Sequence, residues 1–257
     1  MKPLIDSTIV CGQARYRVLV CGVSNSSTLL SENTNCLWYG QVSHHPEVQD
    51  LVYIGADRPA ESWRFLFVQL KNQLGHSSGD FENSRKAIQT AIPELMQGMT
   101  LFKDVLIELA RRCLEYGCSL YANGVLLRSE DSIEELTDAD RKDSGLAGIP
   151  LDKLAGSLDE PTNFVRVYSA GMPPMLLVRD KQVTFPTRSW FPGGLLPDWH
   201  PWKQNVELIA NDRLLQHAEF DGSRSNMTEM HQNLINADYE QLTVPCLELQ
   251  VLSQPSG

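Results

Sequence analysis

Tyr168 to Asp180 reads YSAGMPPMLLVRD, and FPGGLLP at Phe191 to Pro197 and NDRLL at Asn211 to Leu215 follow it. The first block holds two apolar segments that a Gly-Met-Pro-Pro turn separates, since proline and glycine favour turns over continued strands. The second block is a loop punctuated by glycine and proline, and the third opens a further apolar run. This half of the chain therefore predicts short antiparallel strands joined by turns.

In order and spacing, these blocks resemble the C-terminal half of the metal-dependent PPM protein serine/threonine phosphatases, in particular the bacterial SpoIIE/RsbU branch. That branch reads YANAGHPP, then GLPLGL, then GDRLLLYTDGVTE. Near the N-terminus its members carry Gly-Asp before one strand and GDVSGHG at the end of the next. The resemblance implies an α+β fold, an antiparallel β-sandwich flanked by helices, with aspartates that hold two metal ions.

The resemblance also implies which positions of this chain correspond to the metal-binding acids. Gln13 and Gln41 stand where the two N-terminal aspartates are expected. The Asp of the TDG motif corresponds to Glu219 without a gap, or to Asp221 if two residues are inserted. The C-terminal Asp-Asp of the family corresponds to Glu240 and Gln241, with Asp238 nearby but out of register.

Neutral residues at these positions predict a weak metal site. Mg²⁺ and Mn²⁺ prefer anionic oxygen ligands, and an amide oxygen offers only a dipole. The family uses its ions to generate the attacking hydroxide and to neutralise phosphate charge. We therefore expect a pseudophosphatase without a metal cofactor, acting as a protein-binding adaptor or regulator in bacterial signalling.

Two other functions are kept as alternatives. The first is an active phosphoserine/phosphothreonine phosphatase in which Asp221, Asp238 and Glu240 rebuild a site for Mn²⁺ or Mg²⁺. The second is a structural subunit of a larger assembly, with a homo-oligomer as one form of it. In that case the helix expected from Thr100 to Gly117, which has one apolar face, or the aromatic loop would supply the interface.

Aromatic residues gather in the loop between the second and third blocks. Tryptophan is favoured at protein interfaces because it combines a large apolar area with a hydrogen-bond donor. The loop is either a lid over the sheet edge or an exposed binding surface. For the second case we name as binding residues Trp190, Phe191, Trp199 and Trp202.

Composition limits the partners. The chain has 257 residues, a formal net charge of −10 and 42% hydrophobic residues, which fits one globular domain. The negative charge and the lack of a basic run argue against nucleic acid or anionic membranes as partners. Because no signal peptide or long apolar run is present, we expect a cytoplasmic protein with other proteins as partners.

The six cysteines form no CxxC pair and lie mostly in apolar runs, which predicts buried thiols. Acidic residues and glycines between about 128 and 163 predict a solvated, insertion-like segment or a docking element. His44-His45, next to Gln41, also looks like part of the EQVSHHPP fingerprint of oxysterol-binding proteins. That match covers six residues and lacks the basic surroundings that phosphate recognition needs.

The N-terminal half predicts strands at about 8–10, 14–21 and 36–43. We expect a first helix from Asp57 to Gly75, because Trp63, Leu66, Phe67 and Leu70 recur at helical spacing. A second helix, broken or kinked at Pro93, and the helix that begins at Thr100 should follow. Further strands are expected at about 120–127, 164–169, 175–178, 182–185, 205–209, 213–218 and 243–252.

Overall fold

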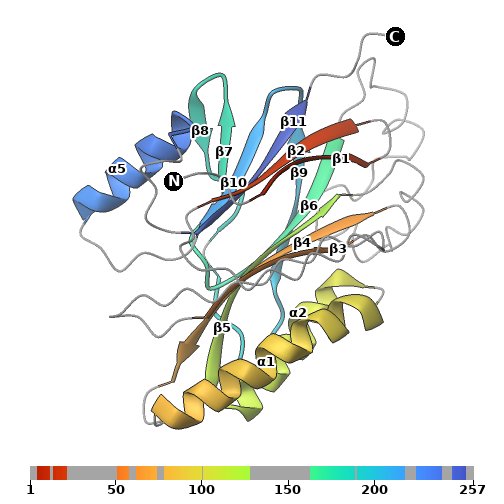
Figure 1. Ribbon diagram of the computed structural model, residues 1–257, viewed down its shortest axis with the longest axis vertical. Coiled ribbons are helices and arrows are strands. Elements are labelled where there is room, and N and C mark those ends of the chain that lie inside the picture. The colour runs from red at the N-terminus through yellow and green to blue at the C-terminus, as the bar shows by residue number, and fades with distance from the viewer. Residues whose placement is uncertain are drawn as a thin grey trace.

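The computed structural model contains two stacked β-sheets with helices on their outer faces (Figure 1). Helices α1 and α2 cover the five-stranded sheet, and α5 lies against the six-stranded one. This arrangement confirms the predicted α+β fold with two antiparallel sheets. The structure describes residues 5–11, 14–21, 51–57, 62–73, 78–99, 101–127, 163–188, 190–217, 224–238 and 245–252.

Both sheets are antiparallel throughout, and each draws strands from both halves of the chain. The six-stranded sheet has the order β1-β2-β11-β10-β7-β8: Ile5–Cys11, Ala14–Cys21, Cys246–Leu252, Arg213–His217, Leu176–Arg179 and Gln182–Thr184. The five-stranded sheet has the order β3-β4-β5-β6-β9: Leu51–Asp57, Trp63–Asn72, Cys118–Leu127, Asn163–Ala170 and Trp202–Leu208.

The prediction of a first helix from Asp57 to Gly75 is wrong, because Trp63–Asn72 form strand β4 instead. Trp63, Phe65 and Phe67 belong to the core between the sheets, whereas Leu66 and Leu70 belong to the core under the helices. A strand that is buried on both faces has a continuous apolar run, and such a run also satisfies helical spacing. Asp57, expected to begin that helix, ends strand β3.

The next two helices are confirmed as α1, Ser78–Gly98, and α2, Phe102–Glu115. Helix α1 continues through Pro93 to Gly98. Its residues Ile88, Ile92 and Met96 are fully buried on the face that packs toward the sheet. The buried Arg64 of β4 fixes the end of α1, because its guanidinium donates to the carbonyls of Met96 and Met99. Helix α5, Arg224–Ile235, was not predicted.

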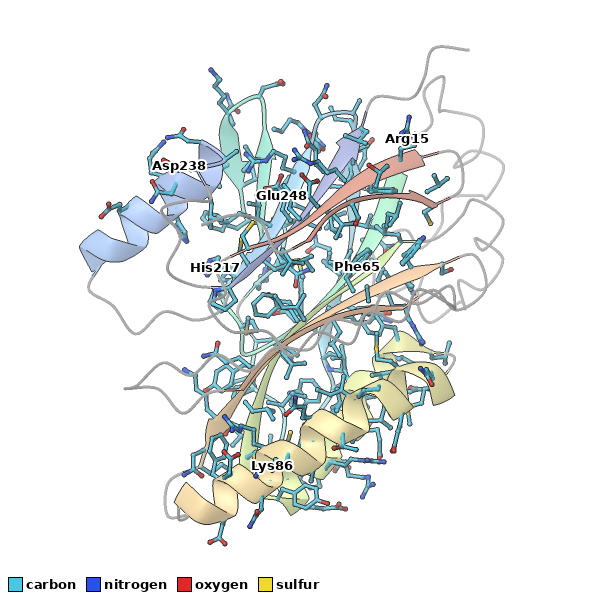
Figure 2. The ribbon with its side chains drawn as sticks, viewed as in Figure 1. Arg15, Phe65, Lys86, His217, Asp238 and Glu248 are labelled. Atoms are coloured by element: carbon cyan, nitrogen blue, oxygen red, sulfur yellow. The ribbon has the colours of Figure 1, made fainter. Side chains whose placement is uncertain are left out.

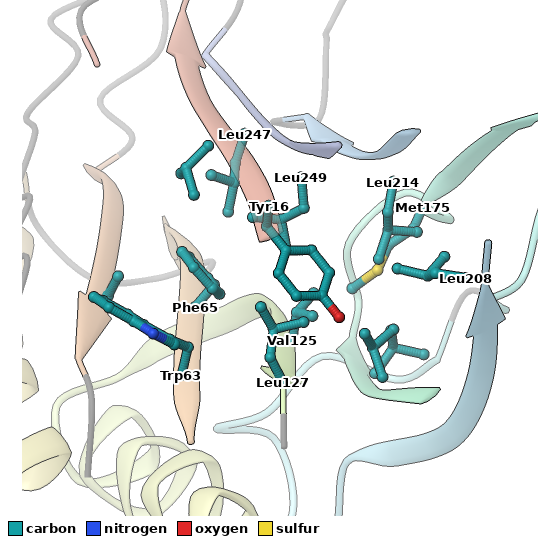
Figure 3. Packing of buried hydrophobic residues seen from close by; sticks show 14 of the residues in the cluster. Tyr16, Trp63, Phe65, Val125, Leu127, Met175, Leu208, Leu214, Leu247 and Leu249 are labelled. Atoms are coloured by element: carbon teal, nitrogen blue, oxygen red, sulfur yellow. The ribbon is translucent and has the colours of Figure 1, made fainter. Parts of the chain in front are cut away.

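Figure 3 shows the apolar core between the sheets, with the ring of Tyr16 reaching from β2 toward the five-stranded sheet. Trp63, Phe65, Leu127 and Leu208 pack in the same cluster. Burial raises the pKa of the Tyr16 phenol far above its usual value, since the interior disfavours the charged form. Because alternate residues of a strand point to the same face of the sheet, every second side chain of these strands lies in this core.

Five cysteines are buried free thiols, as predicted: Cys11, Cys21, Cys113, Cys118 and Cys246. The sixth, Cys36, lies outside the described residues, as do the predicted strand at 36–43, His44-His45 and all but the last residue of the acidic segment 128–163. Within the described part of the chain, no helix combines the length and the apolarity needed to cross a membrane.

Candidate functional site

Several segments that carry the phosphatase resemblance leave the strands at one end of the sandwich. Strand β10 ends at His217, which lies opposite Cys246, the first residue of β11. Strand β4 ends at Asn72, and the chain crosses between the sheets from Ala170 to Leu176. In Figure 2, His217 and Arg15 mark the two ends of the six-stranded sheet. Strands β4 and β10 therefore finish at this end of the sandwich, and β11 starts there. We call it the polar end.

Four buried polar side chains point into the space between the sheets at this end. Each lies two residues from a member of the apolar core on the same strand, and alternate residues share a face. All four are at most 3% exposed, and all four are uncharged. We call this group the polar cluster: Gln69, Asn123, Ser169 and Gln216.

Three members of the polar cluster have atoms with no hydrogen-bond partner among the described residues. These atoms are Asn123 Oδ1, Ser169 Oγ and both polar atoms of the Gln216 amide. Asn123 and Ser169 are register partners on β5 and β6, and Asn123 Nδ2 donates to the Pro173 carbonyl at 3.2 Å. An unpaired buried polar group costs about 1–3 kcal/mol. Buried polar atoms are normally paired with protein or ordered water, so this cluster is a place where further partners would be expected.

A lysine borders the polar cluster on β4. Lys71 lies two residues after Gln69 and one before the strand end at Asn72. Its Nζ atom lies 4.8 Å from the centre of the Tyr121 ring, within the range of a cation–π interaction. Tyr121 is the register partner of Gln69. The polar end therefore presents a cation beside neutral amides and hydroxyls.

These residues do not fit a pair of divalent ions. The polar cluster offers amide and hydroxyl oxygens, whereas Mg²⁺ and Mn²⁺ are held mainly by carboxylates. The Lys71 ammonium would repel a cation nearby. Among the described residues, no group of three or more histidine, cysteine or acidic side chains is arranged to hold a metal ion.

The residues on either side of Gln13, a predicted metal position, lie far from the polar end. Cys11 and Ala14, on either side of Gln13, are at the opposite end of β2 from Cys21, which pairs with Cys246. Eight strand residues span about 23 Å. Asp238 follows α5 and is exposed. The other predicted positions lie outside the described residues: Gln13, Gln41, Glu219, Asp221, Glu240 and Gln241.

The aromatic loop is anchored next to the polar end. Gly193 exchanges two backbone hydrogen bonds with Leu120, of 2.8 and 2.9 Å, and so extends the sheet where β6 no longer pairs with β5. Gln73 Nε2 donates to the carbonyls of Gly194 and Cys118. A Cβ atom on Gly193 would lie 2.7 Å from that of Ala110 on α2, so only glycine allows this close approach.

The outer part of the loop is exposed. Phe191 is 69% exposed and Trp190 42%, and the two rings form an edge-to-face pair. Trp190 Nε1 donates to the His200 carbonyl at 3.0 Å. We define the loop surface as these two residues with the exposed Leu195 and Leu196, which the sequence analysis did not single out.

Two of the predicted binding aromatics belong to the interior instead of the loop surface. Trp199 is 5% exposed, packs in the core under the helices and donates to the Phe191 carbonyl at 2.9 Å. Trp202 begins β9, is half-buried and packs against the core between the sheets. Trp199 thus anchors the loop from below, and Trp202 belongs to the sheet.

Comparison with solved structures gives the fold a counterpart. The chain matches a structure of the RsbU and RsbW domains from a Mycobacterium tuberculosis protein with a TM-score of 0.58 and 13% identity, covering 98% of this chain and 64% of that one. The chain thus spans less than two thirds of that relative. RsbX in complex with magnesium gives a TM-score of 0.48 and 10% identity, over 96% of this chain and 100% of that one.

The catalytic domain of the serine/threonine phosphatase PstP with two manganese ions gives a TM-score of 0.46 and 13% identity, over 93% of this chain and 99% of that one. No family model and no curated protein matches the sequence. At these identities the likeness concerns the fold. The chain therefore has the fold of the metal-dependent PPM protein phosphatases, as RsbU-type domains do.

Proposed function

We propose that the protein is a non-catalytic PPM-fold domain that binds another protein, as an adaptor or regulator in bacterial signalling. The observation that carries this proposal is the polar cluster. At the end of the sandwich where β4 and β10 finish, the buried polar side chains that the structure describes between the sheets are amides and a hydroxyl, with no carboxylate among them. Hard divalent ions need several carboxylates, and hydrolysis in this family needs those ions.

The position of β4 gives this proposal a second support. The family motif GDVSGHG ends the strand that leads into a helix, and here β4 leads into α1. From Asn72 the sequence reads NQLGHS, which keeps the Gly-His of the motif at Gly75 and His76. In this register Asn72 replaces the aspartate. An uncharged side chain thus replaces the aspartate of the motif, whether Gln41 or Asn72 is the equivalent position.

The loop surface supplies the binding function in this proposal. Binding anchors are typically aromatic side chains held in place before the partner arrives, because ordering them on binding would cost free energy. Trp190 and Phe191 meet this condition, since backbone bonds at Gly193 and the buried Trp199 fix their loop. Pro192 and Tyr121 both lie against Gly171, so the loop adjoins the polar end.

A phosphatase assay tests the non-catalytic half of the proposal. The protein, with Mn²⁺ or Mg²⁺ added, is incubated with a phosphoserine peptide, and released phosphate is measured. We expect no release above buffer. Release that Asp221→Asn abolishes, and that Asp238→Asn weakens, would instead establish the alternative of an active phosphatase.

A capture experiment tests the binding half. Immobilised wild-type protein and the double variant Phe191→Ser, Leu196→Ser are exposed to lysate of the source cells. Leu101→Ser is the matched control, because Leu101 is 42% exposed and lies outside the loop. We expect a protein captured by the wild type and the control but lost with the double variant. Equal capture by all three would remove the loop from the proposal.

Light scattering over a range of concentrations addresses the remaining alternative, a structural subunit. An adaptor that binds a different protein should keep the mass of one chain at every concentration. A mass that rises with concentration and falls back in the loop double variant would favour self-assembly through the loop surface.

A further inference from the structure

A row of thiol and imidazole side chains crosses the outer face of the six-stranded sheet. Cys21 on β2 lies opposite Cys246 on β11, and Cys246 lies opposite His217 on β10. Both cysteines are fully buried, and they pack in one cluster with Leu234 of α5. The ring of His217 lies 5.4 Å from that of His231, also on α5. Helix α5 therefore covers the row.

The geometry of the two cysteines suits a covalent link. Directly opposed residues of an antiparallel pair have Cα atoms about 4.5–5.5 Å apart, and disulfides form over about 4.4–6.8 Å. The Cβ atoms of such opposed residues typically stand about 4.5–5.5 Å apart, against about 3.5–4.5 Å in a disulfide. Closing the bond thus requires a movement of about 1 Å, without a change of register.

The two thiols also differ in acidity in a way that favours reaction. The pKa of Cys21 is lowered, chiefly because its sulfur accepts a hydrogen bond from Cys246. The pKa of Cys246 is raised by this same hydrogen bond and by burial. The thiolate is the reactive form of cysteine. The hydrogen bond and the register pairing place the two sulfurs next to each other, so that once one is oxidised the other can attack it.

We propose that Cys21 and Cys246 form a reversible disulfide when the protein meets a peroxide. The Cys21 sulfur attacks one oxygen of hydrogen peroxide, the O–O bond breaks, and the leaving hydroxide takes a proton to become water. The Cys246 sulfur then attacks the sulfenic acid, the S–O bond breaks, and a second water leaves. Both sulfurs are oxidised, and the peroxide is reduced to two waters.

The bond would join the N-terminal hairpin to the last strand at the polar end of the sandwich. Cys246 opens β11, and its register partner His217 ends β10. A disulfide here would fix the start of β11 on β2 and so restrict the movement of this strand. This inference does not depend on whether the protein is catalytic.

The test is peptide mapping of the wild-type protein. Purified protein is freed of reductant, treated with hydrogen peroxide, blocked with an alkylating agent, digested and analysed by mass spectrometry before and after dithiothreitol. We expect a peptide pair containing Cys21 and Cys246, lighter than the two free peptides by two hydrogen atoms and separated by dithiothreitol. In Cys246→Ser, dimedone should label the sulfenic acid on Cys21.

Cys113 and Cys118 provide a matched control in the same molecule. Both are fully buried, but they lie on α2 and β5, and burial raises the pKa of each thiol. The Cys21–Cys246 link should form at least tenfold faster than any link between this pair. If peroxide left Cys21 and Cys246 unlinked, or linked Cys113 to Cys118 at the same rate, the proposal would be overturned.

Discussion

The two ends of the space between the sheets are built from the same strands but from different chemistry. At one end Trp63, Phe65 and Leu127 pack against β2 and β11 in a dry apolar core. At the other end the same strands β4 and β5 place the polar side chains of Gln69 and Asn123 in the interior. Apolar packing stabilises the fold, whereas a buried polar atom without a partner among the described residues, such as Asn123 Oδ1, weakens it. The comparison separates the part of the sandwich that holds the fold from the part that is available for function.

The apolar end should show the largest effect of a single substitution. Phe65→Ala removes a ring that is 1% exposed and leaves a cavity that the rigid sheets cannot close. We expect a loss of about 3–5 kcal/mol in the free energy of unfolding, measured by urea denaturation. A loss well below that would mean that this end is not the stabilising one.

The opposite sign is expected at the polar end. Gln216→Leu replaces an amide whose nitrogen and oxygen have no partner among the described residues with an apolar side chain of similar size. We expect a gain of about 1–2 kcal/mol in the same measurement. Destabilisation by this variant would show that the Gln216 amide is already paired, and the contrast between the ends would then be smaller than we argue.

A smaller gain is expected from Ser169→Ala. The Ser169 hydroxyl is buried without a partner among the described residues, but it is a smaller polar group than the Gln216 amide. The unfolding free energy should rise by about 1 kcal/mol or less. Combining this variant with Gln216→Leu tests coupling, since additive gains would indicate two independent sites and non-additive gains one shared site.

The exposed ion pair between Asp6 and Arg17, on the six-stranded sheet, should have the smallest effect on the free energy of unfolding. Asp6 accepts hydrogen bonds of 2.6 and 2.8 Å from Arg17, which lower its pKa, and both side chains are partly exposed. The pair should contribute about 0.5 kcal/mol or less. That contribution is present above the unfolded pKa of about 3.9 and is lost as the pH falls through the lower folded pKa. Asp6→Asn should abolish this small pH dependence of the free energy of unfolding. Urea denaturation at several pH values between about 5 and about 2 measures it.

The C-terminal half of the fold was predictable from sequence because its strands are short and separated by clear turns. The blocks around Gly171, Gly194 and Asn211 are interrupted at positive-φ residues, and a turn at such a residue leaves a strong local signal. Strand β4 was not predictable in this way. Its residues face two cores, and spacing alone does not distinguish such a strand from a buried helix.

The candidate site was only partly predictable. The exposed Trp190 and Phe191 were named from sequence, and their position beside the polar end follows from Gly193 pairing with Leu120. The polar cluster comes from four different strands and has no local pattern. The misassigned helix also hid the fact that the strand leading into α1 ends at Asn72.

The central claim is that the described residues of the polar end do not supply the anionic ligands that Mg²⁺ and Mn²⁺ prefer, and calorimetric titration with Mn²⁺ tests it most directly. Metal-stripped protein should give no saturable heat up to about millimolar Mn²⁺, because neutral amides and Lys71 offer no anionic ligand set. Saturable binding that disappears in Asp221→Asn would contradict the account and identify a working metal centre.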